Sequence, residues 1–140
     1  MEFKLKPDFE KSRERYEAFW NREIIDRPPV SIVLPVEHPT PVPHKEYKSY
    51  REKWLDIEFR AETIAIQMAN YEYYADALPV AWPNMGPEIY SAWCGCGYQF
   101  GETTTWSEPC IEDWDTDAEK AVFDPEHPVF EATVDFTSLL

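Results

Sequence analysis

The sequence has no run of about 18 apolar residues, which argues against a membrane-spanning helix. It is also short of positive charge, because 13 Lys and Arg face 27 Asp and Glu and leave a net charge of −14. Such a surface repels phosphate backbones and anionic lipids, so neither nucleic acid nor a membrane is expected as a partner. The first fifteen residues contain basic side chains but no apolar stretch behind them. This pattern is not that of a signal peptide and predicts a cytoplasmic protein.

Glycine is scarce and proline is abundant, with 4 and 13 residues respectively. This ratio predicts long, stiff, extended connections between the secondary-structure elements. The 140 residues are 44% hydrophobic and 16% aromatic, which is sufficient for a core and argues against wholesale disorder. The length predicts a single domain over residues 1–140.

Cysteine is limited to Cys94, Cys96 and Cys110, and without a secretory signal these read as reduced thiols. A metal site is one interpretation of the Cys-Gly-Cys. Structural zinc usually takes four ligands in pairs spaced two to four residues apart, and the three histidines lie far away among prolines. Packing as small apolar side chains is the alternative. We therefore expect no metal and no cofactor at these cysteines.

The acidic stretch DWDTDAEKAVFD resembles a calcium-binding EF-hand loop, with Asp113, Asp115, Asp117 and Asp124 at ligand positions. However, Ala118 replaces the glycine of the sharp turn, and the last ligand is Asp where Glu is expected. Prolines flank the loop on both sides, so helices cannot frame it. The stretch is therefore interpreted as a solvated acidic loop.

The apolar spacing predicts a helix that begins near Asp8 and runs to Trp20. Residues 44–77 contain neither Pro nor Gly and show a 3.6-residue period, which predicts one long helix or two in line. The short apolar runs Val30–Leu34 and Leu78–Trp82 flank this region and predict two buried parallel strands. Together they form a βαβ pattern, typical of an α/β fold. Further along, a short helix is expected to begin at Pro87-Glu88 and to end at Gly95 or Gly97, and β structure is expected over Tyr98–Trp106.

Candidate binding residues follow the second expected strand. Asn84, Met85 and Gly86 lie where ligands bind in parallel α/β folds, at the carboxyl end of a strand. An Asx turn that leads into the next helix explains the same residues equally well. Glu102 lies among aromatic residues, where a carboxylate acts as an acid or base if its pKa is raised, or simply occupies the wet face of a strand.

Two phrases are similar to a known family. NREIIDRPPVSIVLP resembles the opening of the uroporphyrinogen decarboxylase-like superfamily, and YYADALPVAWPNMGPEIYSAWCGCGYQFGE resembles its second-strand region. The superfamily includes the tetrapyrrole decarboxylase and methyltransferases that work with corrinoid proteins, all of them (β/α)8 barrels. The resemblance implies that the chain is the N-terminal part of a (β/α)8 TIM-barrel-like fold, incomplete at this length because a closed barrel takes ~250 residues.

The chain departs from the family where the decarboxylase carries substrate-gripping arginines. No arginine occurs between Arg27 and Arg51, so decarboxylation of uroporphyrinogen is not expected. The leading hypothesis is a small-molecule-binding relative of the methyltransferases. In it Glu102 is the acid or base, Asn84 orients the ligand, and the remaining binding residues are Trp82, Met85, Gly86 and Trp106.

The competing hypothesis is a non-catalytic fragment or interaction module that pairs with itself or with another chain. A piece of a parallel barrel would leave strand edges and apolar helix faces uncovered. Both hypotheses therefore include a homo-oligomer.

Overall fold

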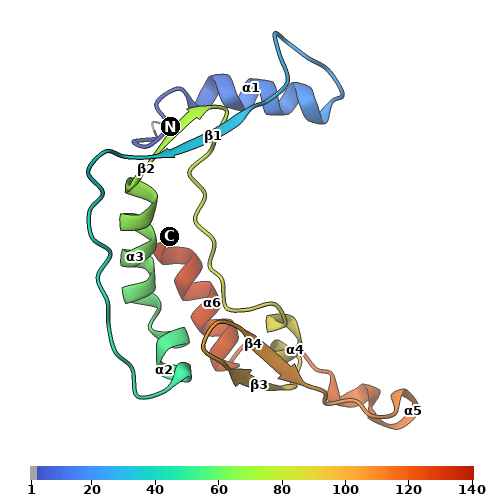
Figure 1. The fold of residues 1–140 in the computed structure, drawn as a ribbon. Coiled ribbons are helices and arrows are strands. Elements are labelled where there is room, and N and C mark those ends of the chain that lie inside the picture. Colours follow the sequence, from blue (N-terminus) through green and yellow to red (C-terminus); the bar gives the residue numbers. More distant parts are fainter. Residues whose placement is uncertain (1–2) are drawn as a thin grey trace. The chain divides into compact units, whose positions relative to one another are not determined.

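A computed structural model describes residues 3–140 and shows short helices and two small antiparallel sheets of two strands each (Figure 1). In chain order the elements are α1 (Phe9–Trp20), β1 (Ser31–Pro35), α2 (Tyr50–Leu55), α3 (Ile57–Ala69), β2 (Tyr71–Ala75), α4 (Ile89–Trp93), β3 (Gly97–Phe100), β4 (Thr105–Glu108), α5 (Trp114–Asp117), the 3-10 turn η1 (Ala118–Lys120) and α6 (Pro128–Leu139). Among the described residues, no helix has the length and apolar character needed to cross a bilayer.

The chain folds into two compact units, each built from separate stretches of sequence. Unit 1 takes the chain up to Pro43 together with Thr63–Ala81, and unit 2 takes His44–Glu62 together with Trp82–Leu140. Unit 1 therefore holds α1 and the β1–β2 sheet, whereas unit 2 holds α2, α4, the β3–β4 hairpin and α6.

The β1–β2 sheet of unit 1 is antiparallel, with Ser31 opposite Ala75 and Pro35 opposite Tyr71. The expected parallel βαβ unit is therefore absent from residues 3–140, and the prediction of the N-terminal part of a (β/α)8 barrel is wrong. The reason lies at Asn70, where the long helical region ends. The side chain of Asn70 accepts from the Thr40 amide at 2.7 Å and donates to the Thr40 carbonyl at 2.8 Å. The chain then turns directly back as a strand.

The second expected strand lies one segment earlier than the sequence suggests. Tyr71–Ala75 is rich in aromatic residues, which favour strands, so the helix predicted over residues 44–77 ends before this segment. Leu78–Trp82 forms no strand, because Pro79 within it has no N–H for a ladder and Pro83 follows. The helix that begins after Asp8 is confirmed as α1.

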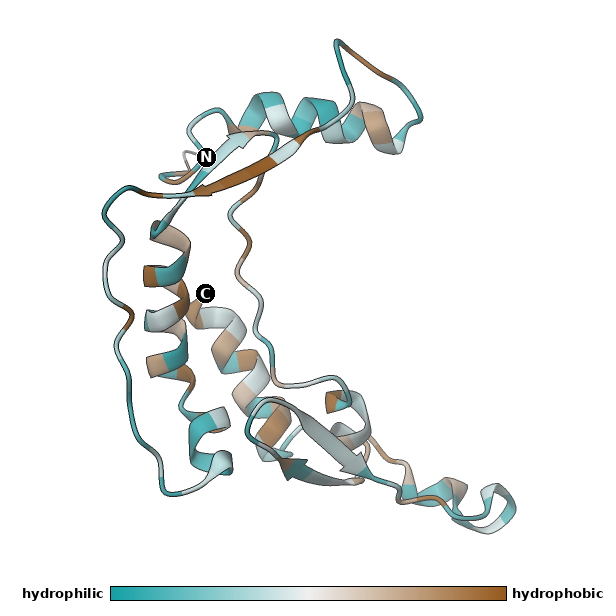
Figure 2. Cartoon of the chain, in the orientation of Figure 1, coloured by the Kyte–Doolittle hydropathy of each residue, from teal (hydrophilic) through white to brown (hydrophobic). Residues whose placement is uncertain are grey.

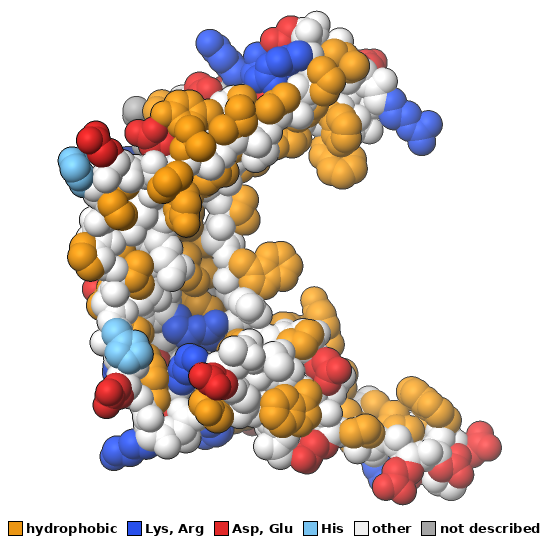
Figure 3. Space-filling model, viewed as in Figure 1, with side chains coloured by type: hydrophobic (Ala, Val, Ile, Leu, Met, Phe, Trp, Pro, Cys, Tyr) orange, Lys and Arg blue, Asp and Glu red, His pale blue; other side chains and the backbone are white. Residues whose placement is uncertain are grey.

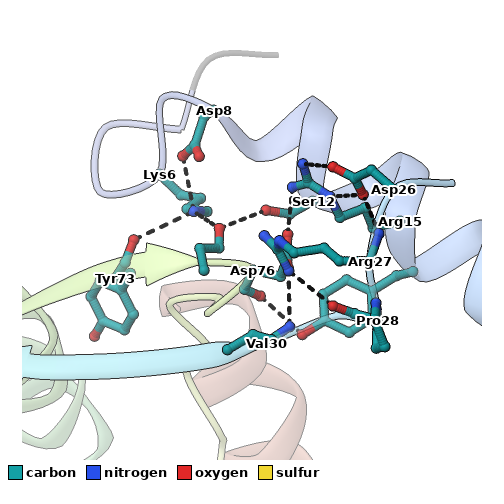
Figure 4. Close-up of polar contacts among 12 residues, drawn as sticks. Lys6, Asp8, Ser12, Arg15, Asp26, Arg27, Pro28, Val30, Tyr73 and Asp76 are labelled. Carbon is teal, nitrogen blue, oxygen red and sulfur yellow. Dashed lines mark hydrogen bonds and ion pairs between the residues drawn. The ribbon is translucent and has the colours of Figure 1, made fainter. Parts of the chain in front are cut away.

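A buried carboxylate joins α1 to the sheet in unit 1 (Figure 4). Asp76 is 0% exposed and lies directly after β2. Its carboxylate accepts from Arg15 at 2.9 Å, from Arg27, and from the Val30 amide at 3.0 Å. Burial acts to raise the pKa of Asp76, but Arg27, the Val30 N–H and Arg15 outweigh it and lower the pKa to about 2.

Lys6 forms a second buried polar contact in unit 1. Its side chain is 1% exposed, and its ammonium donates to the carbonyls of Ala75 at 2.6 Å and Tyr73 at 3.4 Å. An ion pair to Asp8 at 2.9 Å completes its partners. Together with Asp76, these bonds hold the N-terminal segment and α1 against the end of β2.

Strand β1 is apolar but not buried. Ile32, Val33 and Leu34 are 45%, 45% and 49% exposed, although successive residues point to opposite faces of a strand. Figure 2 shows the hydrophobic character along β1, and Figure 3 shows hydrophobic side chains at the surface of this region. Among the described residues of unit 1, the side chains on both faces of the strand are therefore only about half covered.

Unit 2 is built around the β3–β4 hairpin, which confirms the β structure expected over residues 98–106. Trp54 of α2 donates its indole N–H to the Gly101 carbonyl at 2.8 Å. Glu88, which precedes α4, accepts from the Ser107 amide and hydroxyl at 2.6 and 2.7 Å. Helix α6 packs against α4 and places Phe136 in the interior at 0% exposed.

Candidate functional site

The segment before α4 forms a tight turn. The side-chain oxygen of Asn84 accepts a hydrogen bond from the Gly86 amide at 2.9 Å, which is the Asx turn given above as one alternative. Gly86 has φ +107°, a conformation that favours glycine. A Cβ there would collide with Thr105 Oγ1 and lie 2.7 Å from the Tyr98 hydroxyl. Because residue 86 is glycine, the turn can lie directly against the β3–β4 hairpin.

A cavity of about 650 Å³ opens beside this turn in unit 2. We call it the Trp82 pocket. Four residues predicted from the sequence line it together, namely Trp82, Asn84, Met85 and Gly86. Its other walls come from the prolines of the turn, from α4, from the hairpin and from α6, through Pro83, Pro87, Ile89, Tyr90, Trp93, Thr104 and Thr133. The lining is mostly apolar and aromatic and contains no charged side chain among the described residues.

Met85 forms a fixed part of this pocket, because its side chain is 1% exposed. Its carbonyl accepts from the Tyr98 hydroxyl at 2.8 Å and from Thr105 at 3.3 Å. Burial raises the pKa of Tyr98, so this phenol stays a neutral donor at physiological pH. The backbone of the turn is thereby pinned to the hairpin.

Arg60 supports the same turn from α3. Its guanidinium donates to the carbonyls of Trp54 and Asn84 and lies 3.3 Å from the Met85 sulfur. It also stacks over the rings of Trp54 and Phe136, with centroid distances of 5.1 and 4.7 Å. Burial lowers the pKa of Arg60, although an arginine stays charged. No sequence pattern indicates this role, because Arg60 lies within an ordinary helical stretch.

In the described part of the chain, one buried side-chain donor has no hydrogen-bond partner, and it belongs to Trp93. Its ring meets Tyr90 edge-on at 4.8 Å and Phe130 at 5.1 Å. The indole Nε1–H is buried and has no hydrogen-bond partner. Such a group costs about 1–3 kcal/mol if it stays unpaired. A ligand with an acceptor atom that reached Nε1 would recover this energy.

Glu102 and Trp106 lie elsewhere. Glu102 is exposed and lines a different cavity of about 920 Å³, beside residues 44–51 and the hairpin, where Lys53 donates to its carbonyl at 2.8 Å. Trp106 lies on β4 over Gly101 and is 48% exposed. Neither residue lines the Trp82 pocket, so the structure does not bring the expected acid or base to the other predicted residues.

In the acidic stretch, the carboxylates of Asp113 and Asp117 bind groups within the same segment. Asp113 caps α5 by accepting from the Asp115 amide at 2.9 Å. Asp117 accepts from the Glu112 and Asp113 amides and pairs with Lys120 at 2.8 Å, contacts that lower the pKa of Asp117 to about 2. Within residues 3–140, no three His, Cys, Asp or Glu side chains are arranged to hold a metal ion.

Comparison with known proteins assigns no family to this chain. No protein-family model, no curated protein and no solved structure matches the chain. The likeness to the uroporphyrinogen decarboxylase-like superfamily therefore stays a prediction from two sequence phrases, and the barrel that it implied is not the fold of residues 3–140.

Proposed function

We propose that this protein binds a small, uncharged and largely apolar molecule in the Trp82 pocket. The observation that carries the proposal is the pocket itself, which combines about 650 Å³ with a lining of aromatic, proline and aliphatic side chains and no charge. Ligand sites typically measure about 300–1,000 Å³ and are lined by apolar groups with a few polar ones. The lining is rich in flat aromatic rings, so the preferred ligand is a flat, uncharged molecule.

This proposal contains no catalytic step, since Glu102 lines another cavity. It includes a location in the cytoplasm, on account of the three free cysteines. Nucleic acid is left out as a partner because of the net charge of −14. A relation to the methyltransferase branch of the superfamily remains a hypothesis that this function does not require.

The test is a thermal-shift screen of uncharged aromatic fragments, such as indole and naphthol, on the full chain. Trp82→Ala is the informative variant, and Trp114→Ala is its matched control because both side chains are 73% exposed. Loss of the Trp82 wall should weaken binding about fivefold or more, since an aromatic contact with a bound ligand contributes about 1 kcal/mol or more. Equal affinities for the two variants would contradict the site.

A second experiment probes Trp93. Its indole is replaced by the benzothiophene isostere, which keeps the ring shape and removes the N–H. If a bound fragment reaches Nε1 with an acceptor atom, that fragment should lose affinity, whereas fragments without an acceptor should bind as before. The free protein should be no less stable, because the buried Nε1–H has no partner to lose. A clear loss of stability would show that Nε1 is hydrogen-bonded in solution.

Self-association is a second candidate function, favoured by strand β1. Its three central apolar residues are exposed on both faces, and each strand of a two-stranded sheet has one edge without a neighbour. A second copy that pairs along β1 would cover this surface. The net charge of −14 opposes association at low salt, so the oligomer should tighten as salt rises.

Light scattering at micromolar concentration tests this candidate with Val33→Lys and a matched control, Val122→Lys. Val33 lies on β1, whereas Val122 is 63% exposed outside any helix or strand. The first variant should shift the chain toward the monomer and the second should not. A well-folded wild-type monomer at all salt concentrations would rule this candidate out.

A further inference from the structure

The three cysteines meet at one cavity of unit 2, although 14 residues of sequence separate Cys96 from Cys110. The cavity measures about 460 Å³ and lies among α4, the open end of the β3–β4 hairpin and the segment after it. We call it the thiol cavity. All three cysteines are half-buried and unpaired with one another by disulfide bonds, so their sulfur atoms lie in reach of small reagents.

The end of α4 places Cys96 there. Gly95, at φ +92°, takes the left-handed conformation, its amide donates to Ala92, and the Cys96 amide donates to Ser91 at 3.0 Å. This pair of bonds is a Schellman motif, and it confirms that Gly95 ends the helix. The chain reverses at this point and enters β3 directly after Cys96.

The hairpin places Cys110 opposite. The last pair of its ladder joins Gly97 to Glu108, so Cys96 immediately precedes β3 and Cys110 follows β4 by two residues. The register therefore brings Cys96 and Cys110 to the same open end of the hairpin, and both line the thiol cavity. The Cys96 thiol together with burial raises the pKa of Cys110.

We propose that Cys96 and Cys110 are a modification site, where a peroxide converts the two thiols into a reversible disulfide that closes the open end of the β3–β4 hairpin. The Cys96 thiolate attacks one peroxide oxygen, forming an S–O bond as the O–O bond breaks, and the released hydroxide leaves as water. Cys110 then attacks the sulfenic sulfur, the S–S bond forms, and the S–O bond breaks. The proton of Cys110 leaves with the departing hydroxide as a second water.

Cys110 takes the second step because its raised pKa keeps it protonated at neutral pH. One peroxide is reduced to two waters while two thiols are oxidised to one disulfide. A dithiol or phosphine reductant restores both thiols. The new bond closes a loop of about 15 residues, which stabilises the fold by restricting the unfolded chain.

The experiment treats the reduced full chain with hydrogen peroxide, followed by thiol counting and peptide mapping without reductant. Two of the three thiols should disappear, and one linked peptide should join Cys96 to Cys110 within a single chain. The melting temperature should rise by several degrees and return to its starting value after reduction.

Three serine variants complete the design. Cys94→Ser is the matched control and should still form the disulfide, whereas Cys96→Ser and Cys110→Ser should form no internal disulfide. The peptide map of the wild type stands even if a variant fails to fold. A link through Cys94, links between chains only, or three surviving thiols under peroxide treatment that oxidises free cysteine completely would each overturn the proposal.

Discussion

Replacing Asp76 with Asn should destabilise unit 1. The substitution keeps the size of the side chain and its acceptor oxygen for the Val30 amide, but it removes the negative charge that faces Arg15 and Arg27. Both arginines then remain beside a neutral, fully enclosed group. The structure predicts a loss of stability at neutral pH.

Two separate arguments give the size of this loss in the free energy of unfolding. The pKa of Asp76 falls from 3.8 to about 2, and each unit corresponds to 1.36 kcal/mol, so the charged form stabilises the fold by about 2 kcal/mol. Breaking a buried ion pair typically costs about 3–5 kcal/mol. The cost here is smaller because Arg15 keeps its pair with Asp26 at 2.8 Å. We therefore expect about 2–3 kcal/mol.

The pH dependence has a defined direction. The pKa of Asp76 is lower in the folded chain than in the unfolded one, so its contribution is fully present above about pH 4 and disappears as the pH falls through about 2. The carboxyl carbon of Asp76, followed by NMR, should titrate with a midpoint near 2. A midpoint at or above the ordinary 3.8 would show that the arginines do not hold the charge.

Hydrogen exchange measures the change within unit 1. The amides of Val30 and Asp76 lie at the end of the β1–β2 sheet, and opening of the sheet exposes them. At pH 7 their exchange in Asp76→Asn should be about 30-fold faster or more, since 1.4 kcal/mol corresponds to a tenfold change. Glu14→Gln is the control, because Glu14 is exposed on α1 in the same unit. Less than a threefold difference between the two variants would refute the reasoning.

Three further outcomes are expected. Gly86→Ala should destabilise unit 2 by about 2 kcal/mol or more, because a Cβ at φ +107° would collide with Thr105. Urea unfolding measures this loss, and an unchanged midpoint would contradict the tight turn. Calcium titration should show no binding tighter than millimolar, since Asp113 and Asp117 already cap and pair within their own segment, and micromolar affinity would disprove this. A zinc chelator should leave the melting temperature unchanged, whereas one equivalent of zinc lost together with stability in Cys94→Ser would show a metal centre.

Local signals in the sequence predicted those elements that depend on neighbouring residues. The amphipathic spacing before Trp20 gave α1, and Gly95 marked the end of α4. The pairing of β1 depends on residues some forty positions away, and no local pattern distinguishes a parallel from an antiparallel partner. The apolar run of β1 was therefore read as a strand buried in a parallel sheet, while the structure leaves it exposed on both faces.

The residues of the candidate site also divide into those that local sequence predicts and those that only the fold brings together. Trp82, Asn84 and Gly86 line one pocket because they are nearly consecutive in a single turn. Trp93 and Thr133 reach it from α4 and α6, so their proximity depends on helix packing that spacing alone does not reveal. Glu102 was grouped with them through its aromatic neighbours in sequence, yet the hairpin carries it to a different cavity.

The β1–β2 pairing has a consequence for synthesis on the ribosome. Strand β1 emerges first and has to wait for β2, whose residues lie about forty positions later. At about 5–20 residues per second, the apolar run Ile32–Leu34 stays without its partner for about 2–8 seconds, which is long compared with collapse of a nascent chain. Chaperones that recognise short apolar segments have this interval in which to bind. Slow codons between residues 36 and 70 would lengthen it and lower the yield of soluble chain.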